Sequence, residues 1–434
     1  MVAFPQNHFS TAKAPGIKVL LDSLWENPTS FFNNTDPNWR ALCRDLQHID
    51  LSRLNGIKDS IFFGTKRKIF NKSIASQGIL GYLNHESRNK RLRRFEKRFG
   101  SEFRNKKQHP ENKIVLAEGD SWFEYPLFLT DITDNLMQQD NLAVYSLAAG
   151  GDWVANMVSN AEYQQEYLQI KPDVFIISGG GNDIVGDQGI THFVTAHPIN
   201  QHADFVDNYR KYVILRANHQ PVPMCNGSFC PIEYHAFEDS MPLFSARIDT
   251  ASLNKIVWGR RYVNKNYYRW LVTFKLEIKL LFASLRQLDS LHFASLKIIT
   301  QGYDYVIPSM KRDFGMRLIT KNGHWLKMPF EKVGIEDQYT QEAIIMAMIF
   351  DFNEMLIEIG KEYKNIYHVD VRGFTNYLEE YNHKKSGAYW YDEMHPTDPV
   401  FAQIARVYTA IINNEVPVGQ RVFNVIQFFK EKNR

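Results

Sequence analysis

Five short apolar runs between residues 114 and 371 constrain the fold of this chain more than any other feature. Runs that are apolar on both faces and are stopped by glycine or polar residues are typical of strands buried inside a parallel sheet. The sequence therefore predicts a five-stranded parallel sheet built from Ile114–Ala117, Leu142–Leu147, Val174–Ser178, Leu296–Thr300 and Ile366–Val371.

Helical patterns lie between or after these runs. Thr340 is predicted to cap a helix that continues through Tyr363, and Asp398-Pro399 is typical of a helix start with a proline in the first turn. Strands that alternate with helices predict a doubly wound α/β sandwich. In such a fold the ligand site lies beyond the carboxyl ends of the strands.

The chain is longer than one such sandwich needs, since it has 434 residues and a single core holds roughly 200 to 250. We predict a mainly helical, basic N-terminal extension over residues 1–110, an α/β domain over 111–415, and a C-terminal tail or helix over 416–434. An insertion at about 187–291 is too long for a simple crossover, so we expect it to shape substrate access.

The composition is that of a soluble globular protein, with 44% hydrophobic and 23% charged residues. Met1 to Ser10 lack the pattern of a secretory signal, and no stretch stays apolar for the roughly 18 residues of a membrane span. We therefore expect a cytoplasmic protein. The three cysteines are too few for a disulfide framework.

The formal net charge is only +3, so the chain as a whole is not expected to bind nucleic acid. Basic residues nevertheless cluster between Lys58 and Lys107, for example in Lys90-Arg91-Leu92-Arg93-Arg94. Two interpretations stay open for this cluster: a solvated helical face, or a docking surface for an anionic membrane or another polyanion.

Glycine and polar residues follow the first three predicted strands. Ser121, in Gly119-Asp120-Ser121, is placed as a nucleophile, although the same tripeptide is also a good turn. Gly150-Gly151 follows the second strand, and the amide of either glycine can donate to a developing oxyanion. Asn182 follows the third strand and is either a further oxyanion donor or a helix cap.

Asp392 and His395 lie just ahead of the last predicted helix. Residues three apart in a turn can meet, so Asp392 is able to hold the His395 imidazole while its other nitrogen faces Ser121. An exposed ion pair in a turn is the alternative. All these segments fall at strand ends or before a helix, and the fold gathers such positions at one edge of the sheet.

Taken in order, four short blocks resemble those of the SGNH, or GDSL-like, hydrolases: Gly119-Asp120-Ser121, Gly151, Gly180-x-Asn182-Asp183 and Asp392-x-x-His395-Pro396. They are short pieces of a region from about Ile114 to Ile412, and the N-terminal quarter and the insertion lie outside them. Trp122 stands where the family often has leucine, which adds a bulky ring beside the serine.

The resemblance implies a flavodoxin-like, three-layer α/β/α sandwich in which Ser121 is the nucleophile, His395 the general base and Asp392 its orienter. It implies an oxyanion hole formed by the backbone amides of Ser121 and Gly151 and by the side chain of Asn182. It implies no metal and no organic cofactor.

The resemblance also implies two-step hydrolysis of a carboxylic ester, but it does not choose among lipid esters, acetylated carbohydrates and small acyl esters. Two alternatives stay open: a non-catalytic ligand- or membrane-binding protein on the same fold, and an acyltransferase with the same triad. Five residues are candidates for lining the substrate pocket: Trp122, Phe123, Tyr125, Tyr303 and Asp304.

A metal site is not predicted. The histidines of the insertion recur every five residues, which turns successive side chains off a common helical face. The residues considered for such a site are His192, His197, His202, Cys225, Cys230 and His235.

Overall fold

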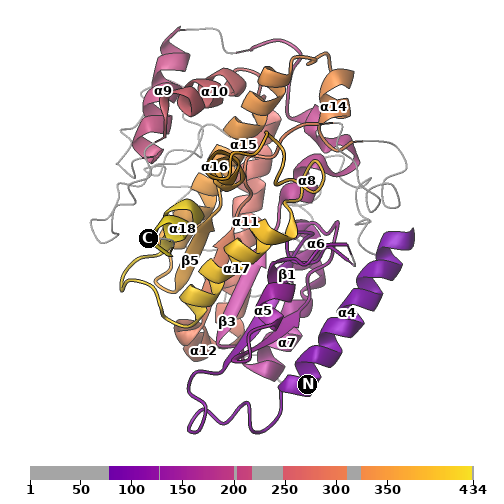
Figure 1. The fold of residues 1–434 in the computed structure, drawn as a ribbon, viewed down its shortest axis with the longest axis vertical. Helices are drawn as coiled ribbons and strands as arrows, with labels where there is room; N and C mark the ends of the chain where they lie inside the picture. Colours follow the sequence, from indigo (N-terminus) through magenta and orange to yellow (C-terminus); the bar gives the residue numbers. More distant parts are fainter. Residues whose placement is uncertain (1–77, 127, 200–202, 218–247, 310–323, 433–434) are drawn as a thin grey trace, which may run out of the picture.

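A six-stranded parallel sheet forms the centre of the protein in a computed structural model, which describes residues 78–126, 128–199, 203–217, 248–309 and 324–432 (Figure 1). The strand order is β2-β1-β3-β4-β5-β6, and the first five strands follow the order 2-1-3-4-5 that is typical of flavodoxin-like sheets. The strands are β1 (Lys113–Gly119), β2 (Leu142–Ser146), β3 (Val174–Ser178), β4 (Lys297–Gln301), β5 (Ile366–Asp370) and β6 (Val422–Asn424).

The first five strands lie where the apolar runs predict them, but the prediction of a five-stranded sheet is wrong in number. The sixth strand, β6, lies in the segment predicted as a tail or helix, and it pairs with β5 through His368 opposite Val422. It has three residues, too few for an apolar run to stand out in the sequence. It is recognised as a strand because it pairs in parallel with β5.

Helices cover both faces of the sheet and give it three layers (Figure 1). On one face α5 packs beside α17, and on the other α11 packs against α6, α7 and α15. The helices of these layers are α5 (Ile132–Met137), α6 (Val154–Asn160), α7 (Glu162–Ile170), α11 (Lys265–Leu288), α15 (Gln338–Lys361) and α17 (Asp398–Ile412).

The remaining helices lie around this core, and Figure 1 shows α9, α10 and α14 beyond one end of the sheet. They are α4 (Gly78–Arg98), α8 (Gly181–Val185), the 3-10 helix η5 (Gly186–His192), α9 (Ala203–Ala217), α10 (Thr250–Arg260), α12 (Ser290–Ser295), α14 (Lys327–Lys332), α16 (Phe374–Tyr381) and α18 (Val425–Lys432). The predicted insertion at about 187–291 therefore includes α11, a helix of the layer that covers the sheet.

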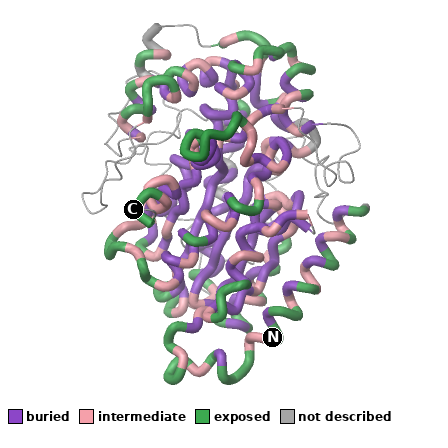
Figure 2. The backbone as a smooth tube through the Cα atoms, in the orientation of Figure 1, coloured by how far each residue is buried: buried purple, intermediate pink, exposed green. Residues whose placement is uncertain are grey.

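Two helix starts differ from the predicted ones by a few residues. The cap of α15 is Asp337 rather than Thr340, because the Asp337 carboxylate accepts a hydrogen bond from the Thr340 N–H at 2.8 Å. The residue that caps α17 is Thr397, with Asp398 and Pro399 in its first turn. Figure 2 shows that buried residues concentrate in the strands and in the helices packed on them.

Helix α4 lies against β2, the edge strand of the sheet. The basic cluster predicted from the sequence is divided on this helix: Arg91 is buried, whereas Lys90, Arg93 and Lys97 are exposed. Docking of the exposed basic residues on an anionic surface stays a prediction. Among the described residues, none of the helices has the length and apolar character needed to cross a membrane.

Candidate active site

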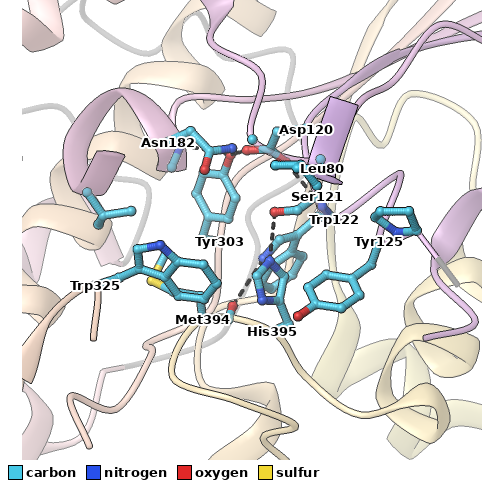
Figure 3. A pocket seen from close by; sticks show the side chains of 15 residues that line it. Leu80, Asp120, Ser121, Trp122, Tyr125, Asn182, Tyr303, Trp325, Met394 and His395 are labelled. Carbon is cyan, nitrogen blue, oxygen red and sulfur yellow. Dashed lines mark hydrogen bonds between the residues drawn. The ribbon is translucent and has the colours of Figure 1, made fainter. Parts of the chain in front are cut away.

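A pocket opens at the carboxyl ends of β1, β2 and β3, and it collects residues from all four sequence blocks (Figure 3). Ser121 follows β1, Gly151 follows β2, and Asn182 lies in the first turn of α8 after β3. His395 comes from the loop before α17. The cavity between them has a volume of about 30 Å³.

Ser121, His395 and Asp392 form a continuous chain of hydrogen-bonding groups. The Oγ of Ser121 lies 2.7 Å from Nε2 of His395, and Nδ1 of His395 lies 2.9 Å from both carboxylate oxygens of Asp392. The structure therefore brings together the three residues that the sequence predicts as a relay. The imidazole is placed to accept the serine proton on one side while the carboxylate orients it on the other.

The Asp392 carboxylate is held by more than the imidazole. It accepts hydrogen bonds from the backbone N–H groups of Met394 at 2.7 Å and His395 at 2.8 Å, and from the Tyr125 hydroxyl at 3.1 Å. Burial raises the pKa of Asp392, but the charge and hydrogen bond of His395 and the backbone N–H groups of Met394 and His395 lower it by more, so its pKa lies below the ordinary value. The carboxylate thus stays charged beside the imidazole.

Close packing and buried hydrogen bonds fix the turn that carries Ser121. Gly119 has no room for a side chain, because a Cβ there would lie 2.7 Å from the carbonyl oxygen of Ser178 on the neighbouring strand. Asp120 is buried and accepts a hydrogen bond from the Tyr303 hydroxyl at 2.5 Å. Burial raises the pKa of Asp120, although the Tyr303 hydrogen bond opposes the shift. The Tyr303 hydroxyl in turn accepts from the Gly181 N–H at 2.9 Å, which joins the ends of β1 and β3.

The two oxyanion candidates outside the serine turn lie at the same pocket. Gly151 has φ of 84°, in the left-handed region that favours glycine. The Gly150 N–H donates to the side chain of Asn84 at 3.1 Å. The Asn182 side chain donates to the carbonyl of Asp152 at 3.2 Å, which holds its amide beside the Gly151 turn. Asn182 lies in the first turn of α8, whose N-cap residue is Gly180, so Asn182 does not cap that helix.

Aromatic rings form the walls of the pocket and hold the imidazole between them (Figure 3). The rings of Tyr125 and Trp325 each meet His395 edge-on, with centroid distances of 4.5 and 5.6 Å. Trp122 is almost fully buried and donates from its indole nitrogen to the carbonyl of Met394 at 3.3 Å. Tyr303 also lines the pocket.

Phe123 and Asp304, predicted as lining residues, do not line this pocket. Phe123 is buried against the ring of Tyr408, with centroids 6.0 Å apart. Asp304 accepts hydrogen bonds from the backbone N–H groups of Gly373 at 2.5 Å and Thr375 at 2.8 Å, so it stabilises the start of α16. A polar residue after a strand is thus also suited to cap a helix, and its position alone does not separate the two roles.

Glu393 is a functional candidate that the sequence does not single out. This buried side chain accepts four backbone N–H groups at 2.6 to 3.1 Å, from Ser309, Trp325, Leu326 and Lys327. Burial raises the pKa of Glu393 to about 7, although the backbone hydrogen bonds oppose the shift. The carboxyl next to Asp392 therefore fixes the segment that carries Trp325 to the imidazole.

Leu80 and Asn84 are further residues at the site that the sequence does not indicate. Leu80 lines the pocket from α4, and the Asn84 side chain bonds the turn before Gly151. Both lie outside the four blocks and more than thirty positions before Ser121, and no local pattern connects them to it.

No group of three or more His, Cys, Asp or Glu side chains suited to hold a metal ion occurs in the described ranges. His192 is exposed on η5, and His197 follows in the connection to α9. The other residues considered for a metal, His202, Cys225, Cys230 and His235, lie outside the described residues.

The chain matches no protein-family model and no curated protein. Among solved structures it is similar to a "putative GDSL-like lipase" from Parabacteroides merdae ATCC 43184, with 10% identity and a TM-score of 0.33 over 70% of this chain and 96% of that chain. A TM-score of this size does not establish a shared family.

Proposed function

We propose that this protein is a carboxylic ester hydrolase of the SGNH type that works through a serine acyl-enzyme. The observation that carries the proposal is the relay of Ser121 Oγ, His395 Nε2 and Asp392, with distances of 2.7 and 2.9 Å, in which Ser121 and His395 line a pocket. Such an arrangement activates a hydroxyl that is otherwise a weak nucleophile.

In the first step Ser121 Oγ attacks the ester carbonyl carbon while His395 Nε2 takes the hydroxyl proton. The tetrahedral intermediate collapses when the alcohol leaves with that proton, and the acyl group stays on Ser121. Water then attacks the acyl-enzyme with His395 again as base. The bond between the acyl carbon and Ser121 Oγ breaks, Oγ takes the proton back from His395, and the carboxylic acid is released. Asp392 keeps the imidazole in one orientation throughout and stabilises its charged form.

The oxyanion of each intermediate is proposed to be held by the Ser121 and Gly151 amides and by the Asn182 side chain. Of the two glycines left open by the sequence, we assign Gly151 to the oxyanion, because it lines the pocket at the turn beside which Asn182 is bonded and has a left-handed φ of 84°. A primary amide has two N–H donors. The bond from Asn182 to Asp152 uses one of them, and we assign the other to the oxyanion.

The size of the pocket favours a short acyl group. Its enclosed volume is small, about 30 Å³, and the rings of Trp325, Tyr125 and Tyr303 are among its walls. Between these rings a long acyl chain finds less enclosed room than an acetyl group does. We therefore propose acetyl and similarly small acyl esters as the substrate class.

The test is release of p-nitrophenol from acetyl, butyryl and longer-chain esters by the parent, by Ser121→Ala and by Ser101→Ala, whose serine lies in an exposed turn. We expect the acetyl ester to be cleaved fastest, Ser101→Ala to match the parent and Ser121→Ala to lose activity. Equal activity in Ser121→Ala, or no cleavage of any ester, would contradict the proposal. Preferential capture of the acyl group by added methanol would instead indicate an acyltransferase.

A further inference from the structure

One face of helix α4 is buried against the α/β core. The buried residues recur every three or four positions, as the helical repeat requires for a packed face: Leu80, Asn84, Ser87, Arg91 and Phe95. Asn84 and Arg91 are polar, and burial of polar groups is costly unless they are hydrogen-bonded. Besides covering the edge strand β2, helix α4 is therefore expected to make buried polar contacts with the core.

Asn84 forms two reciprocal hydrogen bonds with one residue, Gly150, of the turn after β2. Its side-chain Nδ2 donates to the carbonyl of Gly150 at 2.9 Å, and the Gly150 N–H donates to its Oδ1 at 3.1 Å. A primary amide matches the donor and the acceptor of a backbone residue at once, as strands do in a sheet. Asn84 therefore fixes Gly150 through both of its backbone polar groups, the N–H and the C=O.

The space around Gly150 is closed as well. A Cβ at this position would lie 3.0 Å from the carbonyl oxygen of Glu124 and 3.3 Å from Oδ1 of Asn84. The glycine thus packs between α4 and the segment that follows the nucleophile. The next residue, Gly151, lines the pocket with its left-handed φ.

Arg91 anchors the same helix to the segment after Ser121. Its guanidinium lies 2.9 Å from the Glu124 carboxylate and 2.6 Å from that of Asp131, and it donates to the carbonyl of Phe123 at 2.6 Å. Arg91 is 3% exposed, so these contacts are shielded from water. A buried, multiply bonded arginine holds α4 in one register, and that register places Asn84 at Gly150.

We propose that Asn84 is a positioning residue for the oxyanion hole: through its two hydrogen bonds to Gly150 it sets where the Gly151 amide lies relative to Ser121. This inference rests on the ester hydrolysis proposed above. Donors to an oxyanion act only when they are aimed at the place where charge develops, and displacements near 1 Å cost about 100-fold in rate. Asn84 itself does not line the pocket.

The experiment compares Asn84→Ala with the parent and with Asn89→Ala, a matched control on the same helix whose side chain pairs with His85 near the surface. Steady-state kinetics on p-nitrophenyl acetate should show a roughly 10- to 100-fold lower kcat with little change in KM for Asn84→Ala, because the oxyanion forms only after substrate binding. Asn89→Ala should match the parent. Asn84→Leu keeps a similar side-chain shape without either hydrogen-bonding group, and its kcat should fall as that of Asn84→Ala does.

Hydrogen exchange of the Gly150 amide gives a second readout that does not depend on activity. This amide should exchange slowly in the parent and in Asn89→Ala, and faster in Asn84→Ala, which lacks its acceptor. If Asn84→Ala does not fold, as judged by its thermal transition, Asn84→Leu carries both measurements, because it also lacks the acceptor for the Gly150 N–H.

The outcomes separate this inference from the proposed function. An active parent with unchanged kcat in the Asn84 variants overturns the positioning role and leaves the ester hydrolase standing. Unchanged exchange at Gly150 overturns the hydrogen-bonded clamp itself. A parent without esterase activity overturns the proposed function, and the positioning role is lost with it even where Gly150 exchange responds to Asn84.

Discussion

The two sides of the candidate site are built in different ways. On the imidazole side, Asp392 reaches His395 from three residues away, and the same loop supplies the N–H groups of Met394 and His395. On the oxyanion side, the Gly150 turn is bonded by Asn84, a residue 66 positions earlier on a helix outside the sheet. One side is local in sequence, and the other depends on tertiary packing.

This difference has a chemical consequence. The local side orients a proton acceptor through a carboxylate, and its loss should be severe because the reaction needs the correct imidazole tautomer. The oxyanion side depends on tertiary packing and positions neutral donors. Removal of one of them should lower the rate less, because several residues share the stabilisation of the oxyanion. Substitutions on the two sides can therefore rank the contributions.

The largest effect is expected from Asp392→Asn. Because the amide no longer favours the productive tautomer of His395, kcat for p-nitrophenyl acetate should fall on the order of 10⁴-fold. Asp370→Asn is a matched control at a buried aspartate that pairs with Arg372 instead of the site, and its kcat should stay within a few-fold of the parent. A loss smaller than about tenfold in Asp392→Asn would remove the local relay from the account.

A smaller loss is expected from Asn182→Ala on the oxyanion side. Removal of one oxyanion donor typically lowers kcat by about 10² to 10³-fold. The control is Asn156→Ala, whose side chain also bonds Asp152, at its carboxylate and at 3.0 Å. If the two variants have the same kcat, the Asn182 amide acts only in packing and the oxyanion side is simpler than proposed.

A modest change is expected from Tyr125→Phe, which removes the hydroxyl that donates to Asp392 at 3.1 Å but keeps the ring against His395. One such hydrogen bond is worth about 1 kcal/mol, so kcat should fall about fivefold. Tyr391→Phe is a suitable comparison, since the Tyr391 ring packs on Tyr125 with centroids 5.8 Å apart. A loss above about 100-fold would mean that the hydroxyl takes part in the reaction itself.

The smallest expected effect is on the pH dependence of the free energy of unfolding. The pKa of folded Asp392 lies below its ordinary value, so its charged form stabilises the fold at pH above about 4, the unfolded value, and this contribution is lost as pH falls through the folded pKa. The difference in free energy of unfolding between the parent and Asp392→Asn should therefore shrink below pH 4, as measured by urea unfolding.

Asp304 provides the opposite sign in the same experiment. Burial raises its pKa to about 6, so its contribution is largest at low pH and declines as pH rises from about 4 to 6. The difference between the parent and Asp304→Asn should decrease over that rise. The same pH trend for both aspartates would mean that the two carboxyls do not sit in opposite electrostatic environments.

The local features of the site were open to prediction from the sequence, and the tertiary ones were not. The apolar runs predict β1 to β5, and the short spacing of Asp392 and His395 predicts that the two meet, because both depend on neighbours within a few residues. The strand β6 has three residues and is defined by pairing with β5. Asn84 carries no local signal, since its role exists only once α4 lies against the Gly150 turn.

Glu393 and Asp304 extend the same lesson. Glu393 stands next to Asp392 in the sequence, yet it binds backbone groups about seventy positions earlier, around Trp325. Asp304 follows β4 in a position suited to the pocket, but it bonds the start of α16 instead. Which acceptor a buried carboxylate finds depends on the packing of distant segments, and sequence position does not report it.

The central claim is that His395 activates Ser121 as a nucleophile, and covalent trapping tests it most directly. The parent, Ser121→Ala and His395→Ala would be treated with a fluorophosphonate and analysed by intact mass and peptide mapping. We expect one adduct per chain on Ser121 in the parent, none in Ser121→Ala, and strongly slowed labelling in His395→Ala. An adduct on another residue, or equal labelling of the parent and His395→Ala, would contradict it.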